Sequence, residues 1–189
     1  MKRIAVVGDI GSGKSYVAKN FGFPVFNADE EVNKIYKKDK TIFNKLKKSL
    51  SNYVKTFPIN KNEISQSILA NKSNLKKIVN IIHPSVKKKM KIFIKKNEKK
   101  NFIVLDIPLF LENKLNKKND IIVFVQAKKK EIYKKLKKRK NFNSKLLKKF
   151  KNLQLSLEYK KKKSQFIIKN NFTNKSVKVG VKIILKKIL

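Results

Sequence analysis

The chain has 189 residues and a formal net charge of +38, with no cysteine and one histidine. This length suits one domain with a sizeable core, the lack of cysteine excludes disulfides and thiolate chemistry, and one histidine argues against a histidine-built metal site. No apolar stretch approaches the roughly 20 residues of a membrane span, and the apolar run behind the basic start is too short for a signal peptide. We therefore expect a soluble cytoplasmic protein that is a monomer.

The positive charge is of the kind found in nucleic-acid-binding proteins, but the composition favours another origin. Only Arg3 and Arg139 among the 50 basic residues are arginine, the residue best suited to bidentate contacts with nucleic acids. Lys, Asn, Ile and Phe are abundant and all have A/T-rich codons, which indicates mutational bias. Selection for polyanion binding is the alternative. We expect no specific nucleic-acid partner, but non-specific RNA binding at low salt.

Short apolar runs predict strands, and the amphipathic stretches between them predict helices. Most of the runs are apolar without alternation, which is typical of a parallel sheet buried on both faces. Strands that alternate with helices predict an α/β fold with three layers and a central parallel sheet of about five strands. The expected strands are Ile4–Val7, Pro24–Phe26, Phe102–Leu105, Ile121–Val125 and Phe166–Ile168. The expected helices are Lys14–Phe21, Ala28–Lys37, Thr41–Leu50, Glu63–Ala70, Ser73–Lys96, Lys129–Lys138, Ser144–Lys162 and Val177–Ile188.

A glycine-rich stretch separates the first expected strand from the first expected helix. Between a strand and a helix, the pattern G-x-x-x-x-G-K-S indicates a phosphate-binding loop whose backbone N–H groups surround an anion. We expect Lys14 to reach the β- and γ-phosphates of ATP and Ser15 to hold Mg²⁺. The residues of the pattern are Gly8, Asp9, Ile10, Gly11, Ser12, Gly13, Lys14 and Ser15, and Tyr16 follows them.

Asp29 follows the second expected strand, at the start of a helix. A carboxylate there is either a helix cap or first-turn acid, or a general base that takes a proton from an acceptor hydroxyl during phosphoryl transfer. The spacing alone leaves both interpretations open.

Asp106 closes the third expected strand. This position is typical of an acid that supports Mg²⁺ directly or through water, and a cap on the following turn is the alternative. Pro108 suits a chain that leaves the sheet, because proline cannot donate to a strand ladder.

Arg139 and the pair His83-Pro84 also stand out. Arg139 lies between two expected helices, where a mobile lid could bring its guanidinium onto phosphate oxygens. The alternative is that Arg139 has no function and is an arginine that the bias toward lysine did not replace.

His83-Pro84 predicts a helix break, because the residue before a proline avoids the α region. A structural cap is the favoured role of this pair, and contact with an acceptor substrate is the alternative.

Taken in order along nearly the whole chain, these segments resemble the dephospho-CoA kinase family. Phosphate loops are shared by many enzymes, but their combination with the later motifs is far more specific. The matching segments are the loop Gly8–Ser15, Asn27-Ala28-Asp29 for a D-A-D motif, Ile81–Pro84 for an apolar-H-P motif, Asp106–Glu112, the lid set Arg139, Gln154 and Lys160, and the last strand Ser164–Asn170.

The resemblance implies a kinase that transfers the γ-phosphoryl group of ATP to the ribose 3′-hydroxyl of dephospho-CoA. Lys14 and the amides of the loop would hold the phosphates of ATP, and Asn170 would lie near its adenine. Arg139 would act from the lid. Ser15 would bind Mg²⁺, supported by Asp106.

On the acceptor side, the resemblance implies that Asp29 is the base and that His83 and Pro108 lie near dephospho-CoA. One kinase domain would then span residues 1–189. Its parts would be a core of residues 1–40 and 100–189, a helical acceptor-binding region at about 41–99, and a lid at about 138–160.

The chain departs from the family pattern at four positions. The first acid of D-A-D is Asn27, and Asn33, Lys61 and Phe150 stand where the family has arginine. Lysine keeps the positive charge but loses the bidentate fork. We therefore expect weaker substrate positioning and lower catalytic efficiency, with the chemistry retained.

Three other functions are alternatives to this one. A nucleoside monophosphate kinase would share the phosphate loop, but the H-P and P-L-x-x-E segments argue against it. A basic RNA-binding protein would concentrate arginine or aromatic residues on one face, a pattern that the sequence lacks. A decayed copy with little activity would not be expected to keep the loop, Asp29 and Arg139.

Overall fold

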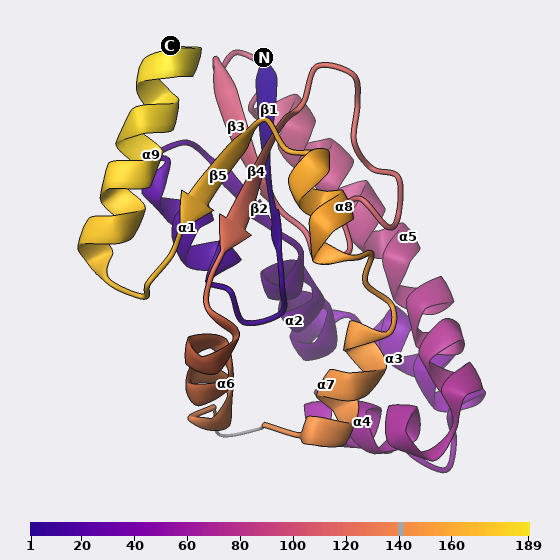
Figure 1. The fold of residues 1–189 in the computed structure, drawn as a ribbon. Helices are drawn as coiled ribbons and strands as arrows, with labels where there is room; N and C mark the ends of the chain where they lie inside the picture. The colour runs from indigo at the N-terminus through magenta and orange to yellow at the C-terminus, as the bar shows by residue number, and fades with distance from the viewer. Residues whose placement is uncertain (140–141) are drawn as a thin grey trace.

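The computed structural model describes residues 1–139 and 142–189, and Figure 1 shows a central sheet flanked by helices. The strands run parallel in the order β2-β3-β1-β4-β5, so the α/β prediction is confirmed. Since β1 lies in the middle, the segment that follows it emerges at the centre of the carboxyl edge, where ligands of such sheets bind. The strands are β1 Lys2–Gly8, β2 Val25–Asn27, β3 Phe102–Asp106, β4 Ile121–Gln126 and β5 Phe166–Lys169.

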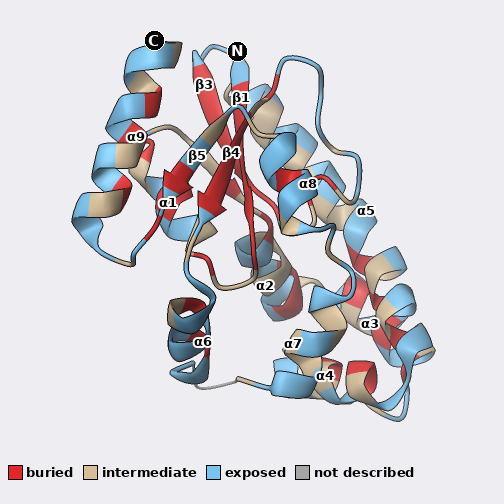
Figure 2. Cartoon of the chain, in the orientation of Figure 1, coloured by how far each residue is buried: buried red, intermediate tan, exposed pale blue. Residues whose placement is uncertain are grey.

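Helices cover both faces of the sheet, and alternate residues of β1 point to each face. Ile4 and Val6 join a core with α1 (Lys14–Asn20) and α9 (Asn174–Ile188). Ala5 and Val7 join a second core on the opposite face, against which α5 (Lys72–Lys96) and α8 (Leu157–Lys162) pack. Figure 2 shows β1, β3 and β4 as mostly buried between these layers.

A third core lies in a helical bundle beyond the carboxyl edge of the sheet (Figures 1 and 2). The bundle consists of α2 (Ala28–Lys38), α3 (Lys40–Ser49), α4 (Lys61–Ala70) and the first half of α5. The helix α7 (Ser144–Lys151) packs on this bundle, and α6 (Lys129–Lys137) follows β4. The expected acceptor-binding region, 41–99, therefore contains most of the bundle. The expected lid, 138–160, includes α7, and its residues 140–141 lie outside the described residues.

The single helix expected at Ser144–Lys162 is a wrong prediction. The chain forms α7 and α8, which a short turn separates, because polar contacts divert the backbone between them. The N–H of Leu155 donates to the Glu112 carboxylate at 3.1 Å, and the Ser156 hydroxyl caps α8 by accepting from the N–H of Tyr159 at 3.1 Å. A new N-cap of this kind starts a helix instead of continuing one.

The helix break expected at His83-Pro84 is also wrong, because α5 runs through Pro84 without interruption. Proline inside a helix removes one hydrogen bond, here the bond that the carbonyl of Asn80 would accept. Apolar residues on both sides of Pro84, Ile82 and Val86, pack into the helical bundle, and this packing holds the helix together.

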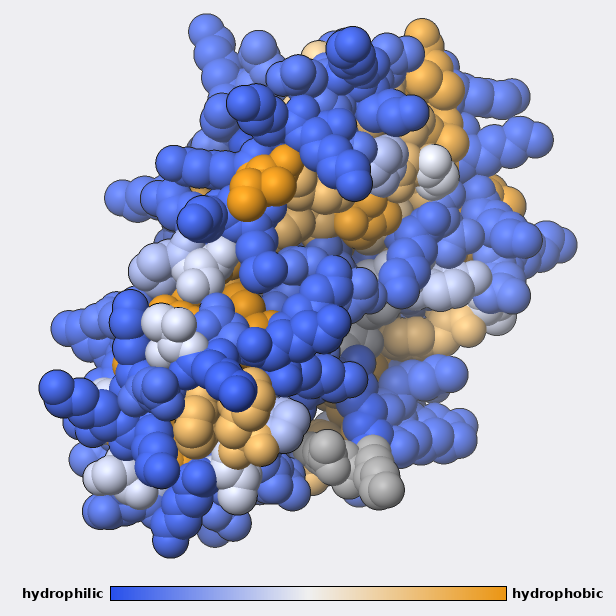
Figure 3. Space-filling model, turned by 180° about the vertical axis from the view of Figure 1, so that it is seen from behind, coloured by the Kyte–Doolittle hydropathy of each residue, from blue (hydrophilic) through white to orange (hydrophobic). Residues whose placement is uncertain are grey.

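The outer surface is dominated by hydrophilic residues, as the rear view in Figure 3 shows. The lysines of the chain lie mostly on exposed helix faces, so the large positive charge is mainly a property of the surface. In the part of the chain that the structure describes, no helix has both the length and the apolar character that crossing a membrane requires.

Arg3 is one of the few buried charged residues, and it joins β1 to the loop before β4. Its Nε donates to Asp120 Oδ1 at 2.6 Å, and a second guanidinium nitrogen pairs with Asp120 Oδ2. The same guanidinium donates to the carbonyl of Leu115 at 3.2 Å. Planar, bidentate geometry of this kind needs arginine, which gives a physical reason for arginine at this position.

We predict that Arg3→Met lowers the free energy of unfolding by about 3–5 kcal/mol, because Asp120 becomes a buried charge without its partner. The matched control is Lys19→Met, which removes the exposed pair between Lys19 and Glu30 and should cost less than about 1 kcal/mol. Urea unfolding followed by circular dichroism measures both. Equal losses in the two variants would contradict a special role for the buried pair.

Candidate active site

The phosphate loop begins where β1 ends and leads directly into α1. Gly13 has φ of +91°, a left-handed conformation that side-chain-bearing residues rarely adopt. A Cβ at this position would clash with Nδ2 of Asn170, so any larger residue would have to displace the Asn170 amide from its hydrogen bond to the loop. The backbone conformation of Gly13 and its close neighbour Asn170 thus explain why the G-x-x-x-x-G-K-S pattern has glycine at this position.

Asn170 holds the loop from the far end of the sheet. Its Nδ2 donates to the carbonyl of Ser12 at 2.9 Å, while its Oδ1 accepts from the N–H of Phe172 at 2.8 Å. Both ends of this amide are therefore engaged within the protein. Asn170 also borders a cavity of about 440 Å³, whose other lining residues are Gln126, Ala127, Lys128, Glu131, Lys169 and Asn171.

Two features of the loop fit an anionic ligand. Ser12 is fully buried, and among the described residues its Oγ is the buried side-chain oxygen or nitrogen without a hydrogen-bond partner. Lys14 lies across the loop, and its Nζ donates to the carbonyl of Asp9 at 2.8 Å. An ammonium bound only to carbonyls and an unpartnered hydroxyl are groups that phosphate oxygens can satisfy.

Asp106 lies beside this loop, at the end of β3. Its Oδ2 accepts from Nδ2 of Asn27 at 2.7 Å, and Oδ1 of Asn27 caps α2 by accepting from the N–H of Glu30 at 2.9 Å. Burial raises the pKa of the Asp106 carboxyl, while the hydroxyl of Ser15 and the charge of Lys14 oppose the rise. Asn27 is thus the cap of α2, and its amide links this cap to Asp106.

Asp29 lies in the first turn of α2 and close to several cations. Asp29 is exposed to solvent and lines the adjoining cavity, yet desolvation by the surrounding chain raises the pKa of its carboxyl. The charges of Lys14, Lys61 and Arg139 partly offset that rise. The structure therefore places Asp29 near three cations from separate parts of the sequence, Lys14, Lys61 and Arg139.

A large cavity of about 620 Å³ opens beside Asp29. His83 and Pro108 both line it, together with apolar residues of α5 and of the loop after β3. Burial lowers the pKa of His83, so its imidazole is neutral at pH 7. The three residues expected on the acceptor side thus share one cavity.

The remaining predicted site residues have distinct surroundings. Arg139 lies two residues after α6, near enough to lower the pKa of Asp29. The side chain of Tyr16 points away from the loop toward α9, where its hydroxyl bonds to Asn174. Only the backbone of Tyr16 can therefore contribute to binding at the loop.

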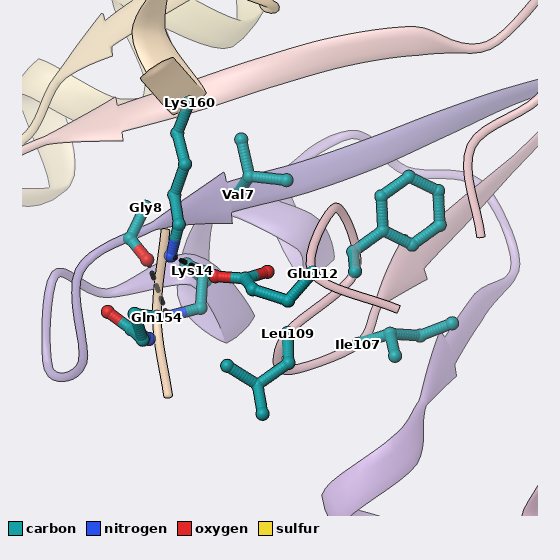
Figure 4. Close-up of a pocket in the computed structure, with 9 residues that line it drawn as sticks. Val7, Gly8, Lys14, Ile107, Leu109, Glu112, Gln154 and Lys160 are labelled. Atoms are coloured by element: carbon teal, nitrogen blue, oxygen red, sulfur yellow. Dashed lines mark hydrogen bonds and ion pairs between the residues drawn. The ribbon is translucent and has the colours of Figure 1, made fainter. Parts of the chain in front are cut away.

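The structure adds a group of residues that was not predicted as part of the site. Glu112, Gln154 and Lys160 lie against Gly8 and Lys14, as Figure 4 shows. They come from the loop after β3, the turn after α7, and α8. Their motif positions were visible in the sequence, but their closeness to the phosphate loop was not.

No cluster of three or more His, Cys, Asp or Glu residues suited to a metal ion occurs in residues 1–139 and 142–189. Mg²⁺ commonly binds through one or two protein oxygens together with substrate phosphates and water. The Ser15 hydroxyl and the Asp106 carboxylate, which lie near one another, are suited to that form of binding.

Comparisons with known proteins agree with this geometry. A family model described as dephospho-CoA kinase matches residues 3–176. The dephospho-CoA kinase of Wolbachia pipientis is 35% identical over 184 residues, which cover 95% of this chain and 94% of that protein.

Two solved structures share the fold at lower identity. A dephospho-CoA kinase from Campylobacter jejuni has a TM-score of 0.65 at 22% identity, covering 99% of this chain and 97% of its own. A Thermus thermophilus protein has a TM-score of 0.80 at 20% identity, covering 100% and 98%.

We predict that Gly13→Ala weakens MgATP binding by at least about tenfold, because the added methyl group forces the loop away from Asn170. The matched control is Gly22→Ala. Gly22 also has a positive φ, +74°, but no atom lies within 4 Å of a Cβ there, so the variant should lose only about 1–2 kcal/mol of stability and no affinity. Isothermal titration calorimetry with MgATP measures both; unchanged affinity in Gly13→Ala would refute the placement of the nucleotide.

Proposed function

The chain belongs to the dephospho-CoA kinase family, and from this premise we propose how its own residues move a phosphoryl group from ATP to dephospho-CoA. It is an ATP-dependent kinase, and we propose that ATP and the acceptor bind on opposite sides of Asp29. The acceptor atom in this proposal is the ribose 3′-hydroxyl, and the products are CoA and ADP.

The triphosphate of ATP binds along the loop Gly8–Ser15 in this proposal. The unpartnered Ser12 hydroxyl, the Lys14 ammonium and the backbone N–H groups of the loop supply the donors. Lys14 exchanges its bond to the Asp9 carbonyl for phosphate oxygens. Adenine takes the cavity of about 440 Å³ beside Asn170, which opens at the end of β5 on the same edge of the sheet.

Dephospho-CoA binds in the cavity of about 620 Å³ that Asp29, His83 and Pro108 line. The cavity offers the neutral imidazole of His83 and apolar walls. These groups suit the uncharged parts of dephospho-CoA, which bind through van der Waals contacts and neutral hydrogen bonds. The acceptor hydroxyl then points toward Asp29, at the end of the cavity nearest Lys14.

Asp29 is the general base. A base must reach the acceptor hydroxyl while the oxygen of that hydroxyl faces the phosphorus that it attacks. Asp29 fits this requirement, because it lines the acceptor cavity and its carboxylate interacts with the charge of Lys14 in the loop. This position, where the two substrates would meet, is the single observation that carries the proposal. The desolvation that raises its pKa also makes its carboxylate a stronger base.

Lys61 and Arg139 supply positive charge from the acceptor region and from the lid. Both interact with Asp29, so both lie where negative charge on the transferring group would be stabilised. Lys61 stands where the family pattern has arginine, and it keeps the charge at this place while losing the fork.

The Ser15 hydroxyl and, directly or through water, the Asp106 carboxylate would hold Mg²⁺, which would supply charge neutralisation at the phosphates of ATP. Asn27 orients Asp106 toward this position through its 2.7 Å hydrogen bond. We further propose that the enzyme acts as a monomer.

We predict that Asp29→Asn lowers acceptor-dependent turnover by about 10²–10⁴-fold, because the amide cannot accept the proton, while MgATP still binds. The measurement is ADP release from MgATP with and without dephospho-CoA, alongside calorimetric titration with MgATP. The matched control is Glu158→Gln, which removes an exposed carboxylate outside the site and should change neither quantity. Near-normal turnover of Asp29→Asn would reject the assignment of the base.

We predict a fall in kcat/KM for dephospho-CoA as the pH drops through the pKa of Asp29, because the protonated carboxyl cannot act as a base. Since burial raises that pKa, the fall should be centred above the ordinary value of 3.8. Lys61→Met removes a charge that holds the pKa down, so the midpoint should move to higher pH. Lys72→Met, an exposed lysine on α5, should leave it unchanged. A midpoint that moves downward in Lys61→Met would contradict this account.

A further inference from the structure

Lys160 is a buried lysine on a helix whose other lysines are exposed. Its side chain is 3% exposed, whereas Lys161 and Lys162, the next residues of α8, face the solvent. A buried ammonium is costly unless a charge or several acceptors compensate it. Its Nζ lies 2.8 Å from Oε1 of Glu112, whose side chain is 11% exposed.

Glu112 connects three segments of the chain. It belongs to the loop that leaves β3 through Asp106, and its Oε1 also accepts from the N–H of Leu155 at 3.1 Å. The carboxylate thus holds both α8 and the turn that carries Gln154. The unpredicted turn between α7 and α8 forms where the N–H of Leu155 bonds to Glu112.

This ion pair lies against the phosphate loop. Lys160, Glu112 and Gln154 line a small space together with Gly8 and Lys14, and Figure 4 shows Lys160 and Glu112 pointing toward each other beside the loop. The closeness also has an electrostatic effect. Burial lowers the pKa of Lys14, and the charge of Lys160 lowers it further, while Asp106 opposes this.

We propose that Glu112 and Lys160 form a charge-compensated positioning pair for the phosphate loop. Glu112 anchors α8 and Gln154 beside the loop, and Lys160 cancels a carboxylate that would otherwise repel the triphosphate. The proposal rests on the binding of ATP phosphates to Gly8–Ser15. It gives Lys160 and Glu112 a function in nucleotide binding beyond that of holding the fold together.

The signs of the two charges make this function distinguishable from a structural one. Removal of Lys160 leaves a negative charge beside the phosphates, and the low local dielectric makes the repulsion strong. Replacement of Glu112 by glutamine keeps an oxygen that can accept from Lys160 and from Leu155, and it leaves a positive charge that favours the triphosphate. A pair that only holds the fold would change the stability of these variants, but the MgATP affinity of the folded proteins would not follow the sign of the charge that is left.

The experiment compares MgATP affinity by isothermal titration calorimetry, without acceptor, in Lys160→Met, Glu112→Gln and the double variant. We expect Lys160→Met to bind about tenfold more weakly than the wild-type protein. Glu112→Gln should bind as tightly as the wild type or more tightly. The double variant, which restores neutrality, should recover most of the affinity that Lys160→Met loses. Lys162→Met, on the exposed face of the same helix, should bind normally.

Thermal unfolding of each variant separates folding from binding. Equal losses of affinity in Lys160→Met and Glu112→Gln, or a double variant as weak as Lys160→Met, would overturn the proposal. Should Lys160→Met not fold, the decision rests on Glu112→Gln, and weaker binding by that folded variant overturns the proposal. Failure of both the wild type and Lys162→Met to bind MgATP would instead reject the placement of the nucleotide, and the proposal with it.

Discussion

The backbone of the phosphate loop can turn from β1 into α1 because Gly13 carries no side chain. The Asn170 amide occupies the space that a Cβ would need, and it holds the loop by donating to the carbonyl of Ser12. This one close approach joins the middle of the sheet to its far edge. The loop thereby lies at the same edge of the sheet as Asp29, which follows β2.

The charges of the interior follow a different rule from those of the surface. The surface carries lysine in excess, and solvent and salt screen it. Inside, where burial makes an isolated charge costly, Arg3 is matched with Asp120 and Lys160 with Glu112. Of these two buried cations, the arginine makes a bidentate contact and the lysine pairs with one carboxylate.

The helix α7 is held on the helical bundle by apolar and polar contacts. Phe150, at a position where the family resemblance predicts arginine, packs against the core of the bundle together with Leu146. The adjacent Lys149 donates to the carbonyls of Ile68 and Leu69 at 2.7 and 3.0 Å, near the C-terminus of α4. Apolar packing and a cation at a helix C-terminus thus dock α7 on the bundle.

The sequence by itself determined the parallel sheet, the phosphate loop and the acids at the strand ends, because hydrophobic runs, glycine spacing and strand-to-helix order are local properties. It also indicated the family, through the order of short motifs. It did not determine the continuity of α5 through Pro84, the turn between α7 and α8, or the pairing of Asn27 with Asp106. Those features depend on partners distant in the chain: the packing of Ile82 and Val86, the Glu112 carboxylate, and the parallel alignment of β2 with β3. Only the tertiary structure decides which of many possible partners a buried polar group meets, since a local pattern carries no information about distant residues.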